Sequence, residues 1–124
     1  MGFMRIFADA QGESHFEAVE MDFAASEFVP GKPVIGLSPA HTATAVAFAR
    51  VPADWEGGWH PTPRRQFCVV ISGSADIRTS DGEVHRFTPG SAFLLEDTTG
   101  AGHNTLTLGG TEAVVFLAWL EPSH

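Results

Sequence analysis

Short apolar runs separated by turn-forming residues make up most of this chain. Seven of these runs predict β-strands, at residues 44–50, 67–71, 75–79, 84–87, 92–95, 105–108 and 113–120. The last six are separated by the segments SGS, SDGE, TPGS, EDTTGAGH and GGTE, which are rich in glycine and polar residues. No stretch keeps a 3.6-residue period. Many short strands with turns between them favour an all-β fold, an antiparallel sandwich or barrel.

Toward the N-terminus the pattern is less regular. In residues 15–23, HFEAVEMDF, acidic side chains interrupt the apolar ones. This predicts an edge strand with one face in water, and a short helix is the alternative. Residues 29–41 hold three prolines and two glycines and predict a loop or an extended arm that can reach a neighbouring subunit. Further along, residues 80–83 contain an Asp-Gly pair between two strands, the signal of a tight hairpin turn.

Length and charge narrow the function classes. A chain of 124 residues, 44% of them apolar, predicts one domain with one core. The net charge of −8 disfavours nucleic acid and anionic membrane surfaces as partners. The N-terminal residues lack a long apolar core, so neither a secretory signal nor a membrane anchor is expected, and the cytoplasm is the default compartment. The one cysteine, Cys68, lies in an apolar run and is expected to behave as a small hydrophobe.

The stretch from residue 59 to residue 73, WHPTPRRQFCVVISG, sets a polar cluster directly before an apolar strand. Side chains alternate between the two faces of an extended chain. If the two prolines do not shift the register, one face carries His60, Thr62, Gln66, Cys68 and Val70. One face of one strand is thus predicted to carry a set of ligand-binding side chains.

Residues 59–103 resemble the conserved core of the cupin superfamily, small β-barrels of jelly-roll type with two sequence motifs. The first motif is a glycine, a His-x-His pair, a Glu and a later glycine, and its places are taken by Gly57 or Gly58, His60, Thr62, Gln66 and Gly73. The second is matched by Gly82, the turn at residues 88–90 and His103, although the gap before His103 is longer and no Asn takes the usual place after it. The resemblance implies an antiparallel jelly-roll β-barrel, with residues 44–120 as the motif-bearing core and residues 1–41 packed outside it.

The departures from the motif bear on metal binding. Cupins that bind a divalent metal typically use three imidazoles and one carboxylate. Here the resemblance leaves only His60 and His103 as imidazoles, with the neutral Gln66 in the carboxylate position and Thr62 in place of the third imidazole. We therefore expect either no metal or a weakly bound Fe, Zn, Mn or Ni ion held by His60, Gln66 and His103.

Neighbouring side chains add candidates for substrate contacts. Arg64 or Arg65 can clamp a carboxylate, but adjacent strand residues face opposite ways, so at most one should reach the pocket. Trp59 and Trp55 can stack on a planar substrate, although packing is the favoured interpretation. Residues 96–97 can supply a general base, yet their sequence favours a polar turn that satisfies its own backbone.

Two function classes remain open. The first is an enzyme that acts on a small organic molecule, with His60 and His103 as catalytic residues and Trp59, Thr62, Arg64 and Gln66 in contact with the substrate. The second is a non-catalytic ligand-binding or sensing module that uses the same pocket. Because the arm and the apolar N-terminal segment need a surface to cover, we also expect a homodimer.

Overall fold

The computed structural model describes residues 1–122, and no helix occurs among them. Its eleven strands are β1 (Gly2–Ala8), β2 (Ser14–Glu20), β3 (Ala24–Ser26), β4 (Ile35–Leu37), β5 (Ala43–Val51), β6 (Gln66–Ser72), β7 (Ala75–Thr79), β8 (Val84–Phe87), β9 (Ala92–Leu95), β10 (His103–Thr107) and β11 (Ala113–Leu120). The predicted all-β fold is confirmed. Within the described residues, no helix is long and apolar enough to cross a membrane.

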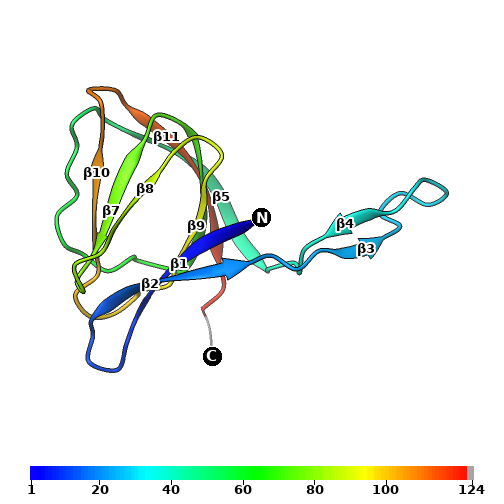
Figure 1. Cartoon of the computed structure of the whole chain (residues 1–124), viewed down its shortest axis with the longest axis horizontal. Coiled ribbons are helices and arrows are strands. Elements are labelled where there is room, and N and C mark those ends of the chain that lie inside the picture. The colour runs from blue at the N-terminus through cyan, green and yellow to red at the C-terminus, as the bar shows by residue number, and fades with distance from the viewer. Residues whose placement is uncertain (123–124) are drawn as a thin grey trace.

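Two sheets face each other across the core (Figure 1). The larger sheet has the order β2-β1-β9-β6-β11-β5, and the smaller one has the order β10-β7-β8. All pairs are antiparallel except β1 with β9, which run parallel. β2 lies at the edge of the larger sheet, so the predicted edge strand is confirmed and the helical alternative is wrong.

The hairpin between β7 and β8 follows the predicted Asp-Gly turn. Thr79 N–H donates to the Glu83 carbonyl at 3.0 Å, and Gly82 N–H donates to the Thr79 carbonyl at 3.1 Å. Gly82 has a φ of 94°, a left-handed conformation that glycine adopts without strain. The turn brings β8 back alongside β7 and completes the smaller sheet.

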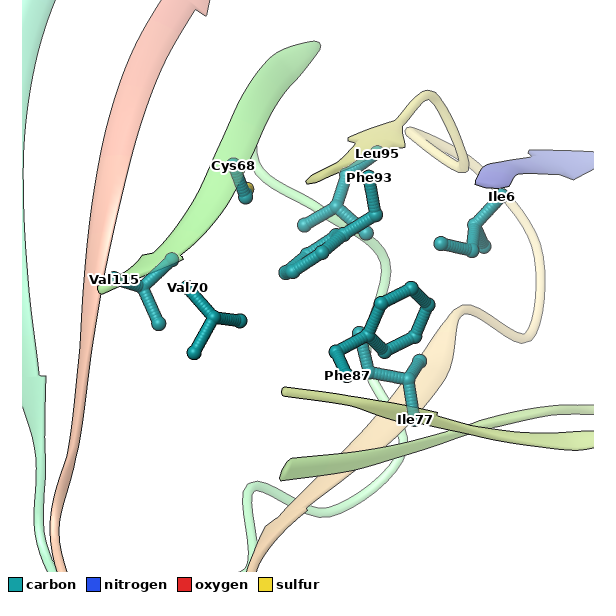
Figure 2. Packing of buried hydrophobic residues seen from close by; sticks show 8 residues of the cluster. All are labelled: Ile6, Cys68, Val70, Ile77, Phe87, Phe93, Leu95 and Val115. Carbon is teal, nitrogen blue, oxygen red and sulfur yellow. The ribbon is translucent and has the colours of Figure 1, made fainter. Parts of the chain in front are cut away.

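The core lies between the two sheets. Along β6, burial alternates as the strand period demands, and the side chains of Gln66, Cys68 and Val70 point inward. Figure 2 shows Ile77 and Phe87 of the smaller sheet lying across from residues of the larger sheet. The buried cluster comprises Ile6, Cys68, Val70, Ile77, Phe87, Phe93, Leu95 and Val115. Burial raises the pKa of the Cys68 thiol, so this cysteine is an unreactive core residue, as predicted.

The N-terminal segment departs from the prediction. Residues 1–41 were expected to pack outside the core, but β1 lies within the larger sheet and its Ile6 is completely buried. The expectation was wrong for β1 because the open edge of β9 needs a hydrogen-bonding partner, which a local sequence pattern does not reveal. Only residues 23–37 project as an arm, with β3 and β4 paired as a short hairpin away from the body (Figure 1).

Candidate functional site

The two motif histidines lie opposite each other on neighbouring backbone segments. His60 N–H donates to the His103 carbonyl at 3.1 Å, and His103 N–H donates to the His60 carbonyl at 3.0 Å. Gly57 N–H also donates to the Thr105 carbonyl, so residues 57–60 run along the free edge of β10. Because paired antiparallel residues point to the same face, the two imidazole rings come together with centroids 5.1 Å apart.

A glycine makes this close approach possible. Gly102 has a φ of 73°, and a Cβ atom built on it would lie 2.0 Å from the carbonyl carbon of His60. Any other residue would push the backbone of β10 away from His60. The glycine before the motif histidine therefore has a steric role in placing the two rings.

Both imidazoles have one nitrogen fixed by an acceptor. His60 Nδ1 lies 2.8 Å from the Gly58 carbonyl oxygen, and His103 Nδ1 lies 2.6 Å from Asp97 Oδ2. A carbonyl oxygen only accepts a hydrogen bond, and a carboxylate accepts from a neutral ring, so Nδ1 carries the proton in each. In the neutral form of either ring, Nε2 keeps a lone pair that can accept a hydrogen bond or bind a ligand.

Asp97 is the site residue that sequence reasoning placed wrongly. The polar-turn interpretation was favoured for residues 96–97, but Asp97 has no exposed surface and its carboxylate orients His103. The loop TTGAG between Asp97 and His103 folds back on itself, with Gly100 and Gly102 at positive φ. The sequence signal that could have identified Asp97 was a carboxylate followed by a short glycine-containing loop and then a histidine.

Glu96 points the other way and joins two strands at the surface. Its carboxylate accepts hydrogen bonds from Arg5 Nε at 2.5 Å and Arg65 Nε at 2.7 Å. Burial by itself would raise the pKa of Glu96, but the two arginines outweigh it and hold the pKa below its ordinary value. Arg65 is thus occupied by Glu96 and by the Glu121 carbonyl, and it is a structural cation.

Gln66 and Thr62 form the buried polar floor beside these rings. Gln66 Nε2 donates to Thr62 Oγ1 at 3.0 Å, and Thr62 Oγ1 donates to the Arg64 carbonyl at 2.8 Å. Thr62 N–H bonds to the Asp97 carbonyl at 3.0 Å, which ties this floor to the carboxylate beside His103. Two buried oxygens among these residues, Gln66 Oε1 and Asp97 Oδ1, have no hydrogen-bond partner.

The aromatic and cationic candidates lie nearer the surface. The Arg64 guanidinium stacks over the Trp119 ring at 4.1 Å, and Trp119 lies opposite Gln66 in the register of β6 and β11. Trp59 is half exposed, with no aromatic partner among the described contacts. The Trp55 ring packs over Gly57, where an added Cβ would lie 2.6 Å from it. Trp55 is nevertheless 39% exposed, so neither tryptophan belongs to the buried core, and Arg64 stays at the Gln66 end of the sandwich.

The donor set does not fit a tightly held divalent metal. The described residues contain no group of three His, Cys, Asp or Glu side chains placed to hold a metal ion. His60 and His103 offer two Nε2 atoms, but Gln66 is neutral, and the carboxylate of Asp97 is bonded to the outer nitrogen of His103. Two neutral nitrogens leave the charge of a divalent ion unbalanced in a buried site.

Three cavities of about 580, 540 and 250 Å³ lie elsewhere on the protein. Their walls contain none of His60, Gln66 or His103. The structure brings these three side chains to one end of the sandwich, linked through Thr62 and Asp97. Gln66 and His103 are buried there, and His60 is half buried.

The chain has low similarity to several solved structures. The chain is similar to a cupin domain from Bordetella pertussis (22% identity over 66% of this chain and 92% of that one, TM-score 0.49). It is also similar to a cupin-2 domain protein from Shewanella frigidimarina (17% identity, 68% and 80%, TM-score 0.48) and to the Cnp3 cupin domain of Schizosaccharomyces pombe (12% identity, 98% and 83%, TM-score 0.49). No family model and no curated protein matches the chain.

The predicted all-β fold class is confirmed by the chain's own strands, which form two facing sheets among the described residues. The similarity to these solved structures is low, with identities of 22% or less and TM-scores below 0.5. It assigns neither a ligand nor a reaction, which have to be argued from the side chains of this chain.

Proposed function

We propose that this protein binds a small organic molecule at the end of the sandwich where His60, Gln66 and His103 come together. The observation that carries the proposal is the paired arrangement of the two imidazoles, each with Nδ1 fixed and Nε2 left as an acceptor. A ligand that offers N–H or O–H donors would satisfy these nitrogens. Arg64 and Trp59, at the more exposed margin, would contact its outer part.

The buried floor of the site supports a binding role. An unpaired acceptor inside a protein costs roughly 1–3 kcal/mol relative to a paired one. Gln66 Oε1 and Asp97 Oδ1 are both in this condition, although every other polar group of Thr62, Gln66 and Asp97 discussed above has a partner. A hydrogen-bond donor on a bound ligand would pair with these oxygens.

Two versions of the proposal differ in what His103 does. In the enzyme version Nε2 of His103 takes a proton from the bound molecule, because the Asp97 carboxylate stabilises the resulting imidazolium. In the binding version the same nitrogen only accepts a hydrogen bond. The Asp97–His103 pair favours the enzyme version, since the buried carboxylate fixes Nδ1 as the protonated nitrogen and leaves Nε2 as the atom that can take a proton.

Nuclear magnetic resonance tests the site directly. The ¹⁵N-labelled protein would be titrated with a panel of sugars, amino acids and hydroxy acids, and amide shifts at residues 58–66 and 97–104 would report binding. His60→Ala and His103→Ala should each abolish the shifts. His85→Ala is the matched control, because His85 is a half-buried histidine on β8 whose contacts among the described residues are with Glu83 and the Phe16 ring, far along the chain from both motif histidines.

Recovery of the bound compound separates the two versions. A compound that is chemically changed after incubation, and unchanged with His103→Ala, supports the enzyme version. A compound recovered intact supports the binding version. Shifts that map to the cavities elsewhere, and survive both histidine substitutions, would overturn the proposed site.

A further inference from the structure

The outer face of the larger sheet carries a continuous row of apolar side chains. The strand registers align Phe48, Phe116, Val69 and Ala92 across four neighbouring strands, and Phe3 and Val19 continue the row on β1 and β2. None of these side chains belongs to the buried core between the sheets. An antiparallel sheet normally leaves its second face polar, so an apolar second face calls for a cover.

A groove of about 540 Å³ lies on this outer face, at the root of the arm. Its floor comes from the sheet and its rim from residues that lead into and out of the arm. Apolar side chains dominate, and the floor includes Phe3, Val19, Phe67, Val69, Ala92 and Ala118. The two rings of Phe3 and Phe67 meet edge to face at 5.2 Å, which gives the floor a fixed shape.

The arm of the same chain is a second uncovered apolar surface. Residues 23–37 carry six exposed apolar side chains, namely Phe23, Phe28, Val29, Val34, Ile35 and Leu37. A two-stranded hairpin is at best marginally stable in water unless something packs against it. β3 and β4 pair with each other alone, and the arm extends away from the body (Figure 1).

The charge of the chain bears on which surface can cover the outer-face groove and the arm. The chain carries a net charge of −8, so two copies repel each other over most of their surface. The arm holds one acidic and one basic side chain, Glu27 and Lys32, and is neutral overall. The arm can therefore approach a second copy of this chain without adding to that repulsion.

We propose that the arm of one copy lies in the outer-face groove of a second copy, and that the second arm lies in the first groove. This reciprocal exchange is an isologous contact with twofold symmetry, in which each chain covers the surface that the other leaves open. It gives the expected homodimer a specific interface and is independent of the His60–His103 site.

Analytical ultracentrifugation of the full chain tests the assembly. The wild type should sediment with twice the chain mass of 13.3 kDa at tens of micromolar. Val34→Glu, in the arm, should raise the dimer dissociation constant at least about tenfold, equivalent to ~1.4 kcal/mol. Val84→Glu is the matched control, because Val84 is a similarly exposed valine on β8 of the other sheet, and it should change the constant by less than about twofold.

A spin label locates the arm in the partner. A nitroxide would be attached to the Lys32→Cys variant made without ¹⁵N, because the buried Cys68 would not react with the reagent. This spin-labelled protein would then be mixed with ¹⁵N-labelled wild type. Broadening of the Val69, Ala92 and Ala118 amides in the wild-type copy is the expected result. A monomeric wild type, a dimer that Val34→Glu leaves intact, or broadening confined to the smaller sheet would each overturn the proposal, and a monomer would leave the groove to an apolar ligand or another protein.

Discussion

The two faces of the larger sheet show how little separates a core from an interface. Both faces are built from valine, phenylalanine, leucine and alanine on the same strands, in alternating positions. The inner face is covered by β7, β8 and β10, and its side chains are almost fully buried. The outer face carries a row of similar apolar side chains beside charged ones such as Arg5 and Glu17, but among the described residues no sheet covers it. Apolar alternation therefore identifies strands, while coverage by other elements decides which face becomes the core.

The largest expected effect on stability comes from shortening a buried side chain on the inner face. Ile6→Ala should lower the free energy of unfolding by about 2–5 kcal/mol, because it leaves a cavity in a fully packed site. Urea denaturation, followed by tryptophan fluorescence, measures this loss. Phe48→Ala on the outer face should change stability by less than about 0.5 kcal/mol in protein diluted to the monomer. Equal losses for the two substitutions would contradict the distinction between the faces.

A smaller loss is expected from the polar end of the inner face. Asp97→Ala leaves His103 Nδ1 without its acceptor and should cost about 1.5–3 kcal/mol. The change should also shift His103 toward the tautomer with the proton on Nε2, which long-range ¹H–¹⁵N correlation spectra detect. Asp97→Asn keeps an acceptor oxygen and should preserve the original tautomer. An unchanged tautomer in Asp97→Ala would show that Asp97 does not orient the ring.

The amount of bound metal tests whether the side chains at the same end of the sandwich can hold a divalent ion. We expect purified wild-type protein to hold much less than one equivalent of Fe, Zn, Mn or Ni, and to lose it readily to a chelator. The double substitution Thr62→His and Gln66→Glu adds an imidazole and a carboxylate, so its occupancy should rise. Elemental analysis of both proteins before and after chelation gives the answer. A full equivalent that resists chelation of the wild type would contradict the donor-set argument.

The smallest effect concerns a contact that holds the two sheets together at their edge. His15 of β2 lies 2.7 Å from Asp9 and 2.9 Å from Asp81, the latter in the hairpin of the smaller sheet. The hydrogen bond to Asp9, with a weaker contribution from Asp81, raises the pKa of His15 above its ordinary 6.5 despite partial desolvation. Protonated His15 therefore stabilises the fold fully below pH 6.5, and this contribution is lost as the pH rises through the raised pKa.

His15→Gln isolates that contribution. The urea midpoint of the wild type should fall between pH 6.5 and mildly alkaline pH, whereas the midpoint of the variant should stay nearly constant there. Asp9 and Asp81 have lowered pKa values, so their contribution is lost only in acid and does not enter this range. Parallel curves for the two proteins would show that His15 is not a stabilising cation.

Most of the strand plan could be predicted from the sequence because it depends on local alternation and turn chemistry. Residues 75–79, 84–87, 92–95 and 113–120 form strands as predicted. β10 begins at His103, two residues before the predicted start, because its first residue pairs with His60 far away in the chain. The same cause hid the burial of Asp97. Its environment is set by tertiary folding of a loop whose composition is that of an ordinary polar turn.

The position of β1 between β2 and β9 has a consequence for synthesis of the chain. β1 pairs in parallel with β9, so Ile6 can take its place in the core only after residues 92–95 have left the ribosome. Until then the β1–β2 hairpin carries Met4 and Ile6 without the β9 residues that they face in the finished sheet. Contacts of such long sequence separation form slowly, and exposed strand edges invite aggregation in the meantime. Folding yield should therefore depend on keeping the first eight residues soluble while the rest of the protein is made.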